Sequence, residues 1–377
     1  LDFTNGYTIS NFDSGLSTST TYMQVHDNYS VTLSNDGNTR INFHLTGGGA
    51  FNGGNIKINE YVNGSWVEKM SWTSDIPSNW MAPHYCISGD GNVAVFIVSD
   101  NNAAACQIQK FMKSNGSWSR IQYIAASEGY DLGNESGRHI GINYDGSVLV
   151  TYFNSNTTPY GFCVWRNNNS SNQYEIEFTN ASTNGLTSYQ EYYAFWNTLS
   201  NDGNTIAISD NRYDSNNSGG RIEIWKYDSN NSPVWTKEHN ITIGQTYTWN
   251  NIGFSDISWF GLYNELSGDG NKLVTAATCR YTNNTMYQHR IFLTYEYNGT
   301  TWILQNIASV QNNPQDHTPP QYHSVNRNRY EIKLSKDGNI LVIPRKLDNA
   351  YYYSYNVSQY DMNIFKWDNT NKNWTLL

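Results

Sequence analysis

The sequence predicts an all-β protein, a six-bladed β-propeller with four antiparallel strands in each blade. Three observations lead to this fold class: a tight-turn motif occurs six times along 377 residues, a second hairpin follows each copy, and apolar strands flank both. A four-stranded sheet with apolar residues on both faces is not stable alone, so six such units must pack against one another. A closed propeller packs them without long exposed edges.

The first recurring element is the apolar-Ser-x-Asp-Gly-Asn motif, seen in full at Leu199–Asn204. Its aspartates are Asp36, Asp90, Asp145, Asp202, Asp269 and Asp337, at steps of 54, 55, 57, 67 and 68 residues. An Asp-Gly pair between apolar strands is a strong hairpin signal. We interpret the six aspartates as structural turn residues, because a calcium loop would need further oxygen ligands at alternating positions.

The second recurring element is a strand, a polar turn and then an aromatic residue, as in Asn63-Gly64-Ser65-Trp66. Asn115-Gly116-Ser117-Trp118 and Asn298-Gly299-Thr300-Thr301-Trp302 repeat it, and looser versions precede Tyr174, Trp235 and Trp374. These aromatic residues are expected to pack between outer strands.

The motif turn, together with a later strand such as Ile222-Glu223-Ile224-Trp225-Lys226-Tyr227-Asp228, resembles the blade pattern of WD40-like propeller repeats. The resemblance covers roughly residues 24–377. It implies the propeller fold and no particular activity, since propellers of this kind host scaffolds, lectins and enzymes.

The chain divides into an N-terminal strand or arm over residues 1–23 and a propeller over 24–377. The expected blades are 24–72, 80–125, 138–179, 193–242, 260–308 and 328–377. Leu1–Ile9 alternates as a strand, and the chain ends inside the outermost strand of the last blade. The N-terminal strand is expected either to complete its own ring or to pair with an edge on another subunit.

Composition excludes several partners. The 23 Lys and Arg face 32 Asp and Glu, giving a net charge of −9 and no basic stripe for nucleic acid. No apolar run reaches the roughly 18 residues of a membrane helix, so no membrane insertion is expected. The start at Leu1 without Met suggests a processed chain. The four cysteines are expected to be buried free thiols.

Several sequons fall in the second hairpin turns of successive blades, which points to N-glycosylation and an extracellular, secreted protein. The candidate asparagines are Asn63, Asn115, Asn168, Asn169, Asn230 and Asn298. In an antiparallel blade these turns share one face of the disc with the Asp-Gly turns.

The opposite face receives long aromatic connections, and binding usually resides in such loops. The ligand-face candidates are His84, His139, Trp196, Trp249, Trp259 and Tyr263. His84 and His139 with Glu331 form no contiguous ligand pattern, so neither a metal nor another cofactor is expected.

The sequence favours a structural or adhesive module that self-associates, as a fibre or surface layer, or that binds another surface protein or glycan. One alternative is a carbohydrate-binding propeller, in which Trp249 and Trp259 would stack on sugar rings. A glycosidase or lyase with carboxylates from several blades is a third, but no catalytic residue is assigned, because no G-x-S-x-G, H-E-x-x-H or P-loop motif occurs.

Overall fold

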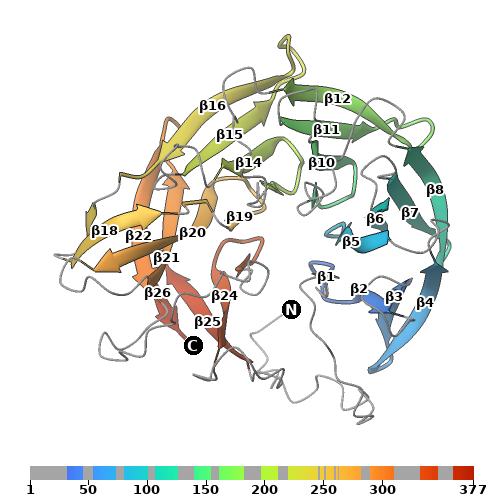
Figure 1. Cartoon of the computed structure of the whole chain (residues 1–377), viewed down its shortest axis with the longest axis horizontal. Helices are drawn as coiled ribbons and strands as arrows, with labels where there is room; N and C mark the ends of the chain where they lie inside the picture. The colour runs from blue at the N-terminus through green and yellow to red at the C-terminus, as the bar shows by residue number, and fades with distance from the viewer. Residues whose placement is uncertain are drawn as a thin grey trace.

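The computed structural model describes residues 32–45, 54–73, 80–100, 107–125, 140–153, 161–181, 197–210, 220–244, 247–249, 252–258, 260–261, 263–281, 289–309, 332–346 and 360–377. In these residues the regular structure is β-strand, and the strands form six antiparallel sheets around a common centre (Figure 1). The all-β, six-bladed fold class is therefore confirmed. The N-terminal strand expected over residues 1–23 lies outside the described residues.

Each blade runs from an inner strand at the centre to an outer strand at the rim. Blade 1 contains β1 (Thr32–Leu33), β2 (Thr39–Leu45), β3 (Gly54–Val62) and β4 (Ser65–Thr73), and blade 2 contains β5 (Trp80–Ile87), β6 (Val93–Asp100), β7 (Gln107–Ser114) and β8 (Ser117–Ala125). Blade 3 contains β9 (Gly141–Ile142), β10 (Val148–Phe153), β11 (Gly161–Asn167) and β12 (Tyr174–Ala181). Blade 4 contains β13 (Asn197–Leu199), β14 (Thr205–Asp210), β15 (Arg221–Tyr227) and β16 (Trp235–Thr242), and blade 6 contains β23 (Lys333–Leu334), β24 (Ile340–Lys346), β25 (Tyr360–Asp368) and β26 (Asn373–Leu376).

Blade 5 departs from the four-strand pattern. It contains β17 (Tyr247–Trp249), β18 (Ile252–Ser258), β19 (Asn264–Leu266), β20 (Lys272–Tyr281), β21 (His289–Tyr297) and β22 (Trp302–Ser309). The innermost position is divided, because β19 pairs with the first part of β20 and β18 with the last part. β17 then adds to the free side of β18. The longer step between Asp202 and Asp269 supplies these extra strands.

All six motif aspartates lie in turns between the first two strands of a blade. In blade 5, Asp269 accepts hydrogen bonds from Ser267 Oγ at 2.6 Å and from the Asn271 backbone N–H at 3.0 Å. Ser267 Oγ also accepts the backbone N–H of Lys272, at 2.9 Å. Gly270 closes the turn at a φ of 73°, a conformation that residues with a Cβ rarely adopt. The motif is thus a self-contained hydrogen-bonded unit.

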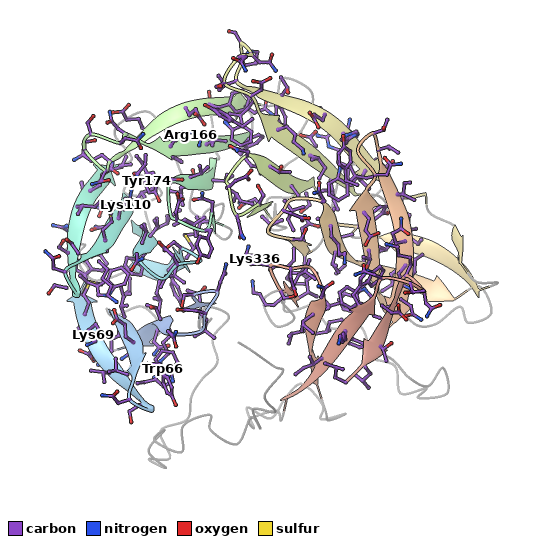
Figure 2. The ribbon with its side chains drawn as sticks, turned by 180° about the vertical axis from the view of Figure 1, so that it is seen from behind. Trp66, Lys69, Lys110, Arg166, Tyr174 and Lys336 are labelled. Carbon is purple, nitrogen blue, oxygen red and sulfur yellow. The ribbon has the colours of Figure 1, made fainter. Side chains whose placement is uncertain are left out.

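The turns also bond to one another around the centre, and we call this series the turn ring. Its backbone hydrogen bonds are Asn35 N–H to Gly89 O, Asp90 N–H to Tyr144 O, Tyr144 N–H to Asn201 O, Asn201 N–H to Gly268 O and Gly268 N–H to Lys336 O, at 2.7–3.2 Å. Lys336 ends the series at the inner edge of the ring (Figure 2). Each bond joins one blade to the next.

The apolar core lies between blades. Alternate residues of a strand point to opposite faces of the sheet, and in blade 2 Val93 and Val95 pack with blade 3 whereas Ala94 and Phe96 pack with blade 1. We call the face toward the following blade in the chain the outgoing face and the other one the incoming face. In the described residues five apolar clusters occur, each shared by two consecutive blades from 1/2 to 5/6.

Two of the cysteines lie in the cluster between blades 2 and 3. Cys86 and Cys163 are free and buried, as expected. Burial raises the pKa of both thiols, that of Cys163 to about 12. Because the thiolate is the reactive form, both are inert in the folded protein.

The motif glycines should matter for two separable reasons, positive φ and contact between blades. Gly116 of a second hairpin turn has the positive φ without the contact, so it separates the two effects. A Cβ on Gly146 (φ 72°) would lie 2.5 Å from the Val93 side chain of blade 2, whereas a Cβ on Gly116 (φ 77°) would meet nothing within 4 Å. We expect Gly116→Ala to lower the free energy of unfolding by about 1–2 kcal/mol through φ strain alone. Gly146→Ala should lower the free energy of unfolding by about 1–3 kcal/mol more, because the added Cβ overpacks the contact with blade 2. Urea denaturation measures both variants, and equal losses would contradict the interblade role.

Acid should weaken the turns. Burial alone would raise the pKa of the Asp269 carboxyl, but hydrogen bonds from Ser267 and Asn271 outweigh it and hold the pKa below its ordinary value of 3.8; Asp36, Asp145 and Asp337 shift the same way. A carboxyl with a depressed folded-state pKa stabilises the protein above its unfolded-state pKa, and the contribution is lost as the pH falls through the folded-state pKa. The melting temperature should therefore fall below about pH 4.

Asp269→Asn supplies the control for this pH dependence. It should lower the melting temperature at pH 7 and make the fall below pH 4 shallower than in the parent protein. Circular dichroism melts between pH 7 and pH 2 measure both effects, and parallel curves for the two proteins would count against the turn chemistry.

Candidate functional site

The junction between blade 6 and blade 1 differs from the other five. The described strands of the six blades form an arc whose two ends are blade 6 and blade 1 (Figure 1). Among the described residues, no apolar cluster and no turn-ring hydrogen bond joins blade 6 to blade 1, although both features join every other consecutive pair. We call this place the open junction. Its two walls are the outgoing face of blade 6 and the incoming face of blade 1.

The outgoing face of blade 6 is apolar and only half-buried at Ile340, Val342 and Ile364. The residues equivalent to Val342, five positions after each motif aspartate, are Ile41, Val95, Val150, Ala207 and Val274, each 0% exposed. The residues equivalent to Ile364 are Ile58, Lys110, Val164, Ile224 and Thr294, also 0% exposed. Blade 6 therefore presents to the open junction the surface that every other blade buries.

The incoming face of blade 1 is mainly polar. Arg40 and Asn42 occupy the positions that carry Ala94 and Phe96 in blade 2, four and six residues after the motif aspartate. The side-chain amides of Asn42 and Asn59 hydrogen-bond across the sheet at 3.0 Å, and the Arg40 guanidinium lies 4.3 Å from the centre of the Trp66 ring. Blade 1 thus satisfies these polar groups internally and offers blade 6 a mainly polar face, on which Leu33, the β1 partner of Arg40, is an exposed apolar residue.

A cation from one blade lies over an aromatic ring of the next at four junctions. The pairs are Lys110 with Tyr174, Arg166 with Tyr227, Lys226 with Tyr297 and Lys272 with Trp367, at 3.7–5.3 Å from the ring centre. Figure 2 shows the first pair side by side. Lys366 occupies the Arg166 and Lys226 position on the outgoing face of blade 6, and it is exposed. Tyr61, the blade 1 equivalent of Tyr227 and Tyr297, is 44% exposed.

Lys110 shows how strongly a sealed junction desolvates its cation. Its side chain is 0% exposed, and Nζ donates to Asn167 Oδ1 and to the Asn172 carbonyl, both of blade 3. Burial lowers the pKa of Lys110 to about 8, although the Asp145 carboxylate acts in the opposite direction. A blade junction in this protein can therefore hold a charged group without water, provided the facing blade supplies acceptors.

The outer aromatic residues add bonds between blades that the sequence did not predict. Trp118 donates its indole N–H to Glu60 at 3.0 Å, Trp235 donates to Glu177 at 2.8 Å and Trp374 donates to Thr294 at 2.8 Å. Each bond reaches back to the preceding blade. These side chains therefore connect neighbouring blades as well as the outer strands of one blade.

The outer strand of blade 6 is short. β26 pairs only with Phe365–Asp368 of β25, and the last backbone bond is Leu377 N–H to Ile364 O at 2.8 Å. In blade 2 the outer strand β8 pairs with β7 over Gln107–Ser114, its full length. In the described part of the chain, no strand pairs with Tyr360–Asn363 on the rim side.

The sequence-predicted glycosylation candidates all lie in the outer turns. Asn63 and Asn115 are exposed, at φ of 52° and 51°. Asn168 donates its amide to Glu175 at 2.8 Å, and Asn230 donates its amide to Asp228 at 3.0 Å. Asn169 and Asn298 are exposed, and Asn298 accepts the N–H groups of Thr300 and Thr301.

The ligand-face candidates are not brought together in the described residues. His139, Trp196 and Trp259 lie outside the described residues, and His84 and Trp249 are placed only as backbone, in β5 and β17. Tyr263 is 2% exposed and packs in the cluster between blades 5 and 6. Its side chain therefore belongs to the core, where it offers no surface to a ligand.

Among the described residues, no group of three or more His, Cys, Asp or Glu side chains is placed to hold a metal ion. No helix within the same ranges is long and apolar enough to cross a membrane.

None of the residues that set the open junction apart was among the sequence-predicted candidates. They are Arg40, Asn42, Ile340, Val342 and Ile364. A signal for the first two was present. In Thr39–Leu45 the polar residues alternate with apolar ones, whereas the matching strands of blades 2 and 3 are apolar on both faces over their first residues.

Three solved structures align with most of this chain. A candidate 6-phosphogluconolactonase from Bacteroides uniformis aligns with 90% of this chain and 80% of its own, at 14% identity and a TM-score of 0.50. A protein from Lactobacillus plantarum aligns with 92% and 82% of the two chains, at 12% identity and 0.48. The Dos1 propeller aligns with 83% and 63%, at 12% identity and 0.45. At 14% identity, the match with a TM-score of 0.50 bears on the fold alone. No family model and no curated protein matches the chain.

Proposed function

We propose that this chain is a secreted, N-glycosylated structural or adhesive β-propeller with WD40-like repeats, and that it self-associates through the open junction. The observation that carries the proposal is the half-buried apolar face of blade 6. Ile340, Val342 and Ile364 occupy positions that the other blades devote to interblade contact. Burying an apolar sheet face of this kind against another surface lowers the free energy of the system.

The exposed Lys366 and Tyr61 support contact with a second copy. These two residues occupy positions whose equivalents pair across the closed junctions, as Arg166 pairs with Tyr227. Lys366 belongs to the outgoing face and Tyr61 to blade 1, so the two ends of the arc are chemically matched at this position. A contact between unlike surfaces of two copies is heterologous and grows into an open chain unless it closes on itself.

The carbohydrate-binding alternative depends on Trp249 and Trp259, whose side chains the structure does not describe. The described residues contain no feature that favours it over self-association. The exposed tyrosines Tyr61, Tyr123 and Tyr144 belong to three different strands or turns and are not grouped by any contact among them.

A charge on the apolar face should prevent assembly. We expect the purified protein to form oligomers or filaments, and Val342→Asp to weaken assembly at least about tenfold, because an unpaired carboxylate would have to leave water at the contact. Light scattering after size-exclusion chromatography measures the particle mass, and negative-stain microscopy shows its shape.

Val67→Asp is the matched control for this variant. Val67 lies in β4 and is 41% exposed, so the same substitution there leaves the open junction untouched. It should assemble as the parent protein does. A parent protein that stays monomeric at all concentrations, or equal behaviour of the two variants, would overturn self-association through this face.

Glycan occupancy should follow the exposure of the outer turns. Asn63 and Asn115 are exposed in tight turns, and their sequons continue with Gly64 and Gly116, where added atoms meet nothing within 4 Å. We expect both to carry glycan in native material, and Asn168 and Asn230, whose amides are bonded to carboxylates, to carry less. Peptide mass spectrometry after enzymatic deglycosylation in heavy-oxygen water measures occupancy at each site. Unmodified Asn63 and Asn115 in native material would argue against a glycosylated protein.

A further inference from the structure

The junction between blades 2 and 3 departs twice from the pattern of the other blades. At the position of Lys110 the other blades carry apolar residues or threonine, namely Ile58, Val164, Ile224, Thr294 and Ile364. At the position of Asn167, which is set by its pairing with the outer aromatic residue, blades 1, 4 and 5 carry Tyr61, Tyr227 and Tyr297. The two departures meet, because the side chains of Lys110 and Asn167 are in contact.

The contact places an amine beside the carbon of a carboxamide. Lys110 Nζ donates to Asn167 Oδ1, and it also donates to the Asn172 carbonyl at 2.9 Å. Oδ1 is bonded to Cγ at about 1.2 Å, so a hydrogen bond to Oδ1 leaves Cγ roughly 3–4 Å from Nζ. This is close to the separation of about 3–3.5 Å at which two reacting atoms are poised to react.

Both groups are held in place by the fold. Lys110 lies in the middle of β7, which is paired along both sides. Asn167 ends β11, and its backbone N–H bonds to Ser147 O at 2.8 Å. The Tyr174 ring covers Nζ at 3.7 Å, as Figure 2 shows for these two side chains. Groups fixed in this way react as if at an effective concentration of about 10⁵–10⁸ M.

The surroundings also favour the reactive form of the amine. Lys110 is 0% exposed, and burial lowers its pKa to about 8. With this pKa roughly a tenth of the amine is neutral at pH 7, about 300-fold more than for an ordinary lysine. A neutral, desolvated lysine is a nucleophile. The Asp145 carboxylate, whose charge acts on Lys110, is a nearby acceptor for the released proton.

We propose that Lys110 and Asn167 form an isopeptide bond that joins blade 2 covalently to blade 3. The ammonium first releases one proton, and the neutral Nζ then attacks Asn167 Cγ. The Nζ–Cγ bond forms, the Cγ–Nδ2 bond breaks, and one proton passes from Nζ to Nδ2, which leaves as ammonia. The reaction consumes no oxidant, reductant or cofactor. It replaces a buried charge, which is costly to desolvate, with a neutral amide.

This inference goes beyond the proposed function, because it concerns a junction inside one copy and does not depend on self-association. The linked residues are 57 positions apart in the chain. A covalent link over such a distance restricts the unfolded chain, as a disulfide does. The cysteines of the same junction, Cys86 and Cys163, are free. The isopeptide would therefore supply this junction with a covalent tie that its thiols do not form.

Peptide mass spectrometry of the folded full-length chain tests the bond directly. After complete proteolysis we expect a branched peptide that contains both Lys110 and Asn167, with the summed mass of the two linear peptides less one ammonia. Tandem fragmentation locates the branch at these two side chains. Recovery of the two linear peptides alone from folded protein would show an ordinary hydrogen bond and would overturn the inference.

Matched variants assign the bond to this pair. Lys110→Met and Asn167→Ala should each abolish the branched peptide. Lys113→Met, at another lysine of β7, and Asn168→Ala, at the next asparagine in the chain, should both retain it. Thermal melts verify that each variant folds. A branched peptide that persists in folded Lys110→Met protein would overturn the assignment to Lys110.

Dependence on folding provides a second readout. Protein kept in concentrated urea should stay unlinked, and the branched peptide should accumulate after dilution into buffer, because only the fold brings Nζ to Cγ. On a denaturing gel the linked chain should migrate faster than the Asn167→Ala chain, since its closed loop makes it more compact. Equal amounts of branched peptide in urea and in buffer would contradict a reaction directed by the blade junction.

Discussion

The contact between one Asp-Gly turn and the next is the constraint on which the ring depends. The motif glycine lies against the first residue of the second strand of the preceding blade, as Gly146 lies against Val93 and Gly203 against Val148. A backbone hydrogen bond joins the same turns at 2.7–3.2 Å. Only a residue without a Cβ fits both the positive φ and the close approach. The turn thereby fixes the fold of its own blade and the distance to its neighbour at once.

Because the contact is repeated, stability is spread over blade junctions. Each described junction combines a turn-ring bond and an apolar cluster, and several add polar contacts at the rim, such as Trp235 to Glu177. In a protein held by nearest-neighbour interfaces, the terminal units are the ones that lack a partner on one side. Blade 1 meets this condition with polar groups on its incoming face, and blade 6 retains apolar ones. This asymmetry makes one end of the arc a surface suited to water and the other a surface suited to contact.

Much of the fold could be predicted because the turn chemistry is local. Ser267, Asp269 and Gly270 make their bonds within a few residues, so the sequence pattern alone identifies each blade. The motif tolerates exchange for the same reason: Asn143 replaces the serine in blade 3 and still accepts the Val148 N–H at 2.9 Å. The divided inner strand of blade 5 was not predicted, because its pairing depends on a register shift between Ser255 and Ser258 rather than on any turn signal. The candidate site was harder still. Tyr263 reads as a loop aromatic in the sequence, and only the packing of blade 6 shows that it is buried.

The two buried thiols bear on where such a protein can persist. Cys86 and Cys163 share one apolar cluster, and burial raises the pKa of both. In an oxidising compartment, thiol–disulfide exchange needs a thiolate that a partner can reach. The folded protein supplies none at these two positions, so it can reside there without crosslinks through them and without the protection of a disulfide. The vulnerable interval is synthesis, before blades 2 and 3 have closed over their sulfur atoms.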